Sequence, residues 1–150
     1  MCRTAGKLRR IYCTCVVVLV VSGGCGGPTE ETIEQRGVSS DNFRVIERAY
    51  RTALQKTRRA PKTRAELAKH LPQGSNVEQL FVSPRDDKPF VVVWGTDLNK
   101  MMTNPEPVVY GYEVDGADGR RFVLTTMGVM EMTDEDFAAA SFPAGHSPPK

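Results

Sequence analysis

The sequence predicts an α+β protein in which an N-terminal amphipathic helix and a short helix pack on a small antiparallel sheet, with a short helix at the C-terminal end. Two observations lead to this prediction. Apolar residues recur at helical spacing between residues 41 and 71, and beyond Gly74 they occur in the short runs typical of strands. Packing an amphipathic helix on a sheet is the economical way to bury both apolar faces.

The first helix is expected to begin at Ser40 or Asp41, since either side chain can cap it, and to stop before Pro61. Its apolar residues form one stripe on a helical wheel: Phe43, Ile46, Tyr50, Ala53 and Leu54. The sequence Thr63-x-x-Glu66 is a capping box, which predicts a second, short helix that ends near His70 or Leu71.

The apolar runs after Gly74 predict the strands. Gln79–Ser83 is expected to be a short strand, and the continuous apolar run Phe90–Trp94 is typical of a strand covered on both faces. Residues 108–114 alternate, with one face made by Val108, Tyr110, Tyr112 and Val114 and the other by Gly111 and Glu113.

Two further strands, Arg121–Thr126 and Val129–Met132, are expected to be joined by a turn at Met127-Gly128. The loop Asp115–Gly119 (DGADG) predicts a hairpin connection rather than a calcium site, because only two carboxylates are local and two arginines follow. Thr133 and the three acids after it predict the short C-terminal helix, since acids are favoured in a first turn.

At 150 residues the chain has the length of one domain. We expect a signal peptide over residues 1–24, a lipidated Cys25 and flexible tether over 25–40, a single α+β domain over 41–140 and a disordered tail over 141–150. The tether and the tail hold few large apolar residues, so they are expected to bury too little surface to offset the entropy of ordering.

The first 25 residues have the pattern of an export signal. Four cationic residues precede an apolar run from Ile11 to Val21, which is shorter than the roughly 20 residues that cross a bilayer. The sequence Val21-Ser22-Gly23-Gly24-Cys25 that follows resembles the lipobox of bacterial lipoproteins, with Ser22 where that family usually has Leu or another aliphatic residue. The resemblance implies cleavage between Gly24 and Cys25 and attachment of acyl chains such as palmitate at Cys25.

Other interpretations of this segment stay open. Ser22 and Gly24 also fit the small-x-small rule for ordinary secretory cleavage, and an uncleaved anchor or a cytosolic protein are further alternatives. Cysteine usage favours lipidation, since no cysteine follows Cys25 and the domain therefore has no disulfide and no thiolate metal site. We expect a chain held on the lipid bilayer by its acyl chains and facing the periplasm or the cell exterior.

Charge is divided along the chain. Residues 41–70 carry nine Lys/Arg and three Asp/Glu, whereas residues 71–150 carry six and twelve. Five cations of the basic half are predicted to form a stripe that could contact an anionic surface: Arg44, Arg48, Arg51, Arg58 and Lys62. The alternatives are a solvated helix face, or an acidic partner that could be the chain's own acidic half. Nucleic acid is not an expected partner in that compartment.

No catalytic residue, metal site or cofactor is predicted. The chain has two histidines, His70 at the end of the short helix and His146 in the tail, too few for a convincing zinc or hydrolase site. A rigid cleft with His70 beside Ser, Asp or Glu would instead favour an enzymatic function. The aromatic residues Trp94, Tyr110 and Tyr112 are expected in the core, and their exposure together would instead favour a platform for an envelope polymer.

Two stretches also resemble the globular part of type II secretion pseudopilins, which has a long helix, a Pro-containing segment with a short helix and a small antiparallel sheet. They are FRVIERAYRTALQKTRRAPKTRAELAKHL and SPRDDKPFVVVWG. The chain has no prepilin cleavage motif followed by a long apolar helix, so the resemblance implies the fold and not assembly into a pilus.

The function expected from these observations is a non-catalytic interaction or structural role in the cell envelope. The alternative is a binding module for an envelope polymer or an envelope protein, including a secretion-system component of pseudopilin type. The basic face of the first helix and the aromatic residues of the sheet are the two surfaces that such a module could use.

Overall fold

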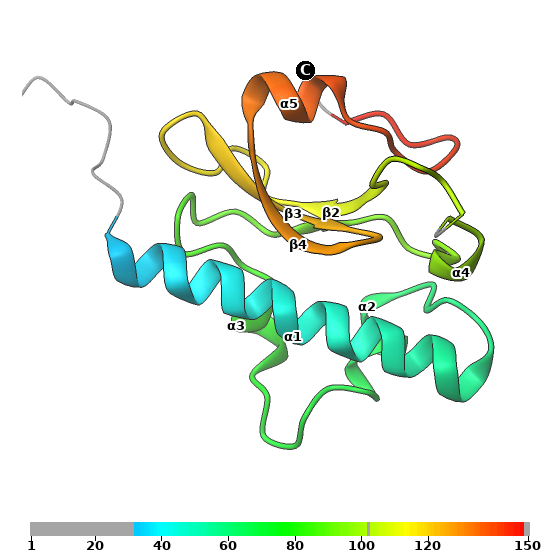
Figure 1. Cartoon of the computed structure of the whole chain (residues 1–150). Helices are drawn as coiled ribbons and strands as arrows, with labels where there is room; N and C mark the ends of the chain where they lie inside the picture. The colour runs from blue at the N-terminus through cyan, green and yellow to red at the C-terminus, as the bar shows by residue number, and fades with distance from the viewer. Residues whose placement is uncertain (1–31, 102, 149–150) are drawn as a thin grey trace, which may run out of the picture.

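The computed structural model describes residues 32–101 and 103–148 (Figure 1). The predicted signal peptide, Cys25 and the first part of the predicted tether lie outside the described residues. The predicted α+β class is confirmed. Within the described residues, five helices and four strands follow in the order α1 (Ile33–Thr57), α2 (Arg64–Ala68), α3 (Val77–Leu80), β1 (Val91–Val92), α4 (Leu98–Met101), β2 (Val109–Tyr112), β3 (Arg120–Thr125), β4 (Gly128–Thr133) and α5 (Asp134–Ala139).

The four described strands form one antiparallel sheet in the order β1-β2-β3-β4. The long helix α1 lies on one side of this sheet and α5 on the other (Figure 1). The sheet therefore separates two layers, and each of its faces carries its own apolar cluster.

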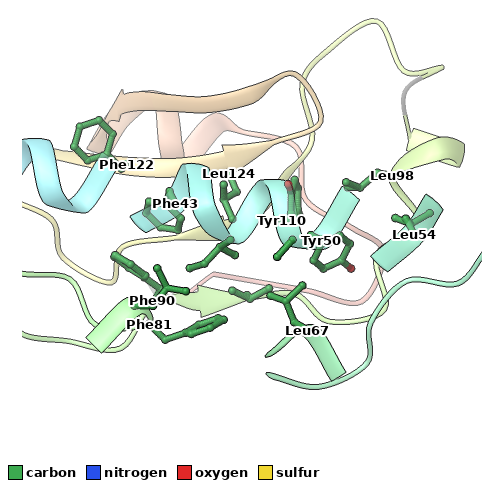
Figure 2. Close-up of a cluster of buried hydrophobic side chains, with 14 residues drawn as sticks. Phe43, Tyr50, Leu54, Leu67, Phe81, Phe90, Leu98, Tyr110, Phe122 and Leu124 are labelled. Carbon is green, nitrogen blue, oxygen red and sulfur yellow. The ribbon is translucent and has the colours of Figure 1, made fainter. Parts of the chain in front are cut away.

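The larger cluster lies between α1, the short helices and the sheet (Figure 2). Phe43 stacks on Phe90 with ring centroids 4.1 Å apart, and Tyr50 lies 5.3 Å from Tyr110. The apolar stripe predicted for the first helix is buried here as expected: Phe43, Ile46, Tyr50, Ala53 and Leu54. Burying this stripe against the sheet is what stabilises α1, because helices in proteins gain most of their stability from tertiary packing.

The start of α1 differs from the prediction. The helix begins at Ile33, so residues 33–40 are helical and are not part of a flexible tether. Thr32 caps it: its side chain accepts from the backbone N–H of Gln35, and the Gln35 side chain accepts from the Thr32 N–H. Thr32-x-x-Gln35 is a capping-box pattern in the sequence itself, but the polar residues after it drew the expected start to Ser40 or Asp41. A bond from the buried Ser39 hydroxyl to the Glu113 carboxylate also holds this stretch.

The end of α1 agrees with the prediction that it stops before Pro61. Arg58 adopts a left-handed conformation and its N–H bonds to the Leu54 carbonyl, as in a common C-terminal cap. The second helix also starts where predicted, with the Thr63 hydroxyl accepting from the Glu66 N–H. The Glu66 carboxylate bonds to the Lys62 N–H at 2.8 Å, one residue earlier than in the standard capping box.

The predicted strand Gln79–Ser83 is wrong. Asn76 caps the helical turn α3 through a bond from the Gln79 N–H to its side chain, and only an isolated bridge between Val82 and Pro89 follows. A short apolar run does not by itself distinguish a strand from a buried helical turn, and here the local cap decided. The sequence also held no clear signal for α4, whose Leu98 is buried in the larger cluster.

The predicted faces of residues 108–114 are wrong as well. A register shift between Val109 and Gly111 interrupts the alternation, so Tyr110 lies in the cluster under α1 whereas Tyr112 packs against Phe137 of α5. Such a bulge places an extra residue in one strand and moves the later side chains to the other face. Gly111 is needed beside it, since a Cβ there would lie 2.9 Å from the Leu124 side chain.

The hairpin connections are close to those predicted. Residues 115–119 join β2 to β3, with the Asp115 and Gly116 N–H groups donating to the Asp86 carboxylate. Between β3 and β4, Thr125 pairs with Gly128, so the turn residues are Thr126 and Met127, one position earlier than predicted. Thr133 caps α5 as expected.

The predicted disordered tail is wrong for residues 141–148, which pack on the α5 side of the sheet. Ser141 bridges to Val108, and Phe142 lies edge-on to Tyr112 and to Phe137. The ring of His146 shares a hydrogen bond of 3.1 Å with the Tyr112 hydroxyl. Although this segment is polar overall, Phe142 supplies the apolar surface that holds it in place.

Candidate functional site

The surface of α1 that turns away from the core carries a basic groove, by which we mean the hollow lined by Arg44, Arg48 and Arg51 together with Glu47, Thr52 and Gln55. Its volume is about 540 Å³. The three arginines follow one another at helical spacing, so α1 itself places them side by side. The structure thus brings together three of the five cations predicted to form a stripe.

Arg58 and Lys62, the other two, do not continue this row. Because α1 ends at Thr57, helical spacing no longer relates the residues beyond it. Arg58 lines a neighbouring hollow with Arg51 and Leu98. Lys62 lines a separate hollow together with Ala53. At about 100° per residue, Ala53 points about 200° around the helix from Arg51, so this hollow lies on a different side of α1 from the basic groove. The prediction of one continuous stripe is therefore wrong.

This separate hollow, which we call the basic hollow, lies between the end of α1 and the start of α2 and has a volume of about 310 Å³. Its lining combines the buried Ala53 and Pro61 with exposed cations and a histidine: Arg59, Lys62, Lys69 and His70. Glu66 is its one carboxylate, and one oxygen of that group already accepts from the Lys62 N–H. The basic hollow could hold a small anionic group.

Within the basic groove, two arginines are paired with acids of the same helix. Arg51 donates to Glu47 at 2.8 Å and to the Thr126 carbonyl at 3.0 Å, which ties α1 to the turn between β3 and β4. Arg44 lies 3.2 Å from Asp41, and both side chains are largely exposed. Arg51 is thus held in place, whereas Arg44 and Arg48 extend into solvent.

The acidic half of the chain does not neutralise the basic half. Between residues 32–70 and 71–148, the described structure has two ion pairs, Arg36 with Glu131 and Arg64 with Glu78. Six cations of the basic half have no ion pair among the described residues: Arg48, Lys56, Arg58, Arg59, Lys62 and Lys69. The hypothesis that the chain's own acidic residues are the partner of this surface is therefore not supported by its contacts.

A buried polar cluster was missed in the sequence. The Glu113 carboxylate, fully buried, accepts from four donors: the Ser39 hydroxyl, the Ser83 hydroxyl at 2.9 Å, Arg85 Nη1 at 2.6 Å and the Phe122 N–H at 2.7 Å. The guanidinium of Arg85, also buried, lies 4.9 Å from the centre of the Phe122 ring. The one available signal was a charged residue inside the apolar run 108–114.

The buried polar cluster contains serine hydroxyls beside a carboxylate, yet it is not arranged as a catalytic site. Both serines donate to the carboxylate, and each of its two oxygens is shared between two donors, so its hydrogen-bonding capacity is largely used inside the cluster. Among the hollows described above, none is lined by Ser39, Ser83 or Glu113. What this arrangement does is join α1 to β2 and β3.

The two histidines lie apart. His70 and Glu66 both line the basic hollow, and no hydrogen bond joins these two side chains in the part of the chain that the structure describes. His146 bonds to Tyr112 on the other side of the sheet. Over residues 32–101 and 103–148, no group of three or more His, Cys, Asp or Glu side chains is placed to hold a metal ion.

The sheet aromatics do not form an exposed platform. Tyr110 and Tyr112 are buried on opposite faces, and Trp94 is partly covered beside Phe81, with ring centroids 6.2 Å apart. Burial raises the pKa of Tyr112, raises the pKa of Tyr110 strongly, and raises that of Tyr50 from its ordinary value near 10 to about 12. These rings serve the core, as expected from their place in the sheet.

None of the described helices has the length and apolar character needed to cross a bilayer. In comparisons with known proteins, no protein family, no curated protein and no solved structure matches this chain.

Proposed function

We propose that this protein is a bacterial lipoprotein whose α+β domain is held at an envelope membrane by acyl chains on Cys25 and has a non-catalytic interaction or structural role there. The observation that carries the proposal is the lipobox-like sequence Val21 to Cys25 after a short apolar run. Cys25 is also the last cysteine of the chain, so acylation would leave the mature protein without a free thiol.

The position of α1 supports a close attachment. Six residues separate Cys25 from Thr32, where the described structure begins. Even fully extended, seven steps of about 3.6 Å span only about 25 Å. An acylated Cys25 would therefore keep the start of α1 within about 25 Å of the bilayer surface. A flexible tether that reached to residue 40 would allow a larger distance.

The non-catalytic role is supported by the chemistry of the described hollows. The basic groove and the basic hollow are lined mainly by arginine, lysine, threonine and short apolar side chains. Among the polar residues of catalytic type, Ser39, Ser83 and Glu113 bond to one another inside the protein. Glu66 and His70 both line the basic hollow, where Glu66 accepts from the Lys62 N–H and no hydrogen bond joins it to His70 within the described residues. Such surfaces suit the binding of an anionic partner.

A second candidate function is favoured by the basic hollow. Arg59, Lys62 and Lys69 gather around it without ion-pair partners among the described residues, so a phosphate or carboxylate group of an envelope polymer could occupy it. In this version the protein is a binding module for such a polymer. A role as a secretion-system component of pseudopilin type is the other form of the alternative, and its support is the sequence resemblance alone.

The proposed anchor is tested by substituting Cys25 with Ser and comparing the product with a Cys15→Ser control, which changes a cysteine inside the expected signal peptide. We expect the wild type and the control to pellet with membranes, and their intact mass to equal a chain that starts at Cys25 plus acyl groups. Cys25→Ser is expected to lose both properties. An unmodified wild-type chain in the soluble fraction would contradict the proposal.

A further inference from the structure

We propose that the outer face of α1 docks on an anionic lipid surface, so that the domain lies with this helix along the membrane. This docking face consists of Arg44, Arg48 and Arg51 with Met127 of the β3–β4 turn and Ile33 at the start of α1. The proposal rests on the proposed function, because the lipid anchor brings the domain to the membrane. It adds which side of the domain faces the lipid and which chemistry it meets there.

The first support is the geometry of α1. At about 100° per residue, Ile33, Arg44 and Arg51 point within about 20° of one direction, and Arg48 about 60° from it. Ile33 is 93% exposed, and the side chain of Arg44 is 66% exposed. One side of a 25-residue helix thus presents an apolar residue at its start and arginines along its middle.

The second support is an exposed apolar residue at the turn beside these arginines. Met127 is 68% exposed, although most large apolar side chains of the described domain are covered. Its neighbour Thr126 accepts a hydrogen bond from Arg51, so the turn is fixed next to the basic groove. Cations together with exposed apolar side chains are typical of surfaces that lie in the membrane interface.

The third support is the distribution of charge across the sheet. The basic groove lies on α1, whereas Asp134, Glu135 and Asp136 lie in the first turn of α5 on the other side (Figure 1). An anionic bilayer would attract the α1 side and repel the α5 side. The charge distribution therefore favours one orientation of the domain over the opposite one.

The fourth support is the short connection to Cys25. A chain of at most about 25 Å joins the anchor to the start of a helix about 37 Å long. The docking face is thereby held at a high effective concentration near the lipid, where weak contacts suffice. Each Lys or Arg at such a surface is expected to shift the balance between docked and undocked forms about fivefold.

The test uses the full mature chain, acylated and reconstituted in vesicles. Since no cysteine follows Cys25, a single introduced cysteine gives one labelling site for a fluorophore that brominated lipids quench. Met127→Cys reports on the docking face, and Gln55→Cys in the basic groove provides a second site should the first substitution disturb the turn. Glu135→Cys on α5 reports on the opposite face.

We expect quenching at positions 127 and 55 in vesicles of phosphatidylglycerol and phosphatidylcholine in equal parts, and much less in phosphatidylcholine alone or in molar salt, which screens surface charges. Position 135 should stay unquenched in all of them. Reversing one charge by Arg48→Glu should lower the ratio of docked to undocked protein about thirtyfold. Lys100→Glu, the same reversal at an exposed position outside the docking face, should leave it unchanged.

Equal quenching at positions 127 and 135, or quenching independent of phosphatidylglycerol, would overturn the proposal. A loss of quenching caused by Lys62→Glu and not by Arg48→Glu would also overturn it, because that result would assign anion binding to the basic hollow. The mass of the reconstituted chain is measured first. A missing acyl group therefore counts against the anchor, whereas absent docking by an acylated chain counts against this inference alone.

Discussion

At the scale of single residues, Glu113, which directly follows β2, connects several separate segments of the structure. Its carboxylate bonds to Ser39 of α1, to Ser83 and Arg85 of the segment before β1, and to the backbone of β3. A buried carboxylate is tolerated only when it is paired and hydrogen-bonded, and here both conditions are met. Through Ser39, these contacts also fix the second turn of α1 against the strands.

Glu113→Gln should therefore destabilise the domain by about 3 kcal/mol, because a buried guanidinium then faces a neutral amide. Glu78→Gln is the matched control: Glu78 also pairs with an arginine, at 3.0 Å, but its side chain is 86% exposed. The control should change the free energy of unfolding by less than about 1 kcal/mol. Urea denaturation measures the free energy of unfolding of both variants. Equal destabilisation by Glu113→Gln and Glu78→Gln would show that the buried polar cluster contributes no more to stability than an exposed ion pair.

At the scale of elements, local sequence patterns predicted the helices and turns that are stabilised by nearby residues or by one apolar face. The buried stripe of α1, the Thr63 cap of α2, the Thr133 cap of α5 and the hairpin at residues 115–119 were all visible in the sequence. Elements held by distant contacts were not. The bond from Ser39 to Glu113, which lies 74 positions later in the chain, is such a contact. The capping box of Thr32 and Gln35 that begins α1 is local, and the expected helix start overlooked it.

The β2 bulge shows the same limit. Alternation predicted Tyr110 and Tyr112 on one face, yet a register shift against β3 separates them. Pairing with a neighbouring strand determines such a shift, so the sequence of one strand does not reveal it. The row of arginines on α1 shows a related limit: the sequence identified Arg44, Arg48 and Arg51, and the end of α1 at Thr57 showed that Arg58 does not continue their row. Lys62 lies after Pro61, where the sequence already predicted that the helix had ended.

Helical structure at the start of α1 predicts the effect of changing Gly37. An added Cβ there would meet nothing within 4 Å, and alanine favours a helix over glycine by about 0.5–1 kcal/mol. Gly37→Ala should raise the free energy of unfolding by about that amount. Gly111→Ala, where the Cβ would approach the Leu124 side chain, should lower it by about 1–3 kcal/mol. No gain from Gly37→Ala in urea denaturation would place residue 37 outside the helix in solution.

At the scale of the whole molecule, the sheet separates two apolar clusters. Tyr50 and Tyr110 lie in one cluster and Tyr112 in the other, and burial raises the pKa of all three. Their un-ionised form is therefore preferred in the folded state on both sides of the sheet. High pH should therefore lower the free energy of unfolding of the whole domain.

In the unfolded chain, the tyrosines ionise near pH 10, whereas in the folded state Tyr50 keeps its proton up to about pH 12. The stability that they contribute is fully present below about pH 10 and decreases as the pH rises toward 12. Urea denaturation across this range should show the decrease, and Tyr50→Phe should make it less steep. A free energy of unfolding independent of pH between 9 and 11 would contradict burial of these hydroxyls.

By itself the sequence determined the α+β class, the buried stripe of α1 and the position of several caps, because period, caps and turns depend on residues close together in the chain. The start of α1 is also marked locally, by the capping box of Thr32 and Gln35, which the expected start at Ser40 or Asp41 overlooked. Only the tertiary structure decided which face each tyrosine of β2 occupies and which cations share one surface. These depend on contacts between residues far apart, such as the pairing of β2 with β3 and the bond from Arg51 to Thr126. Distance along the chain is what separates the two groups.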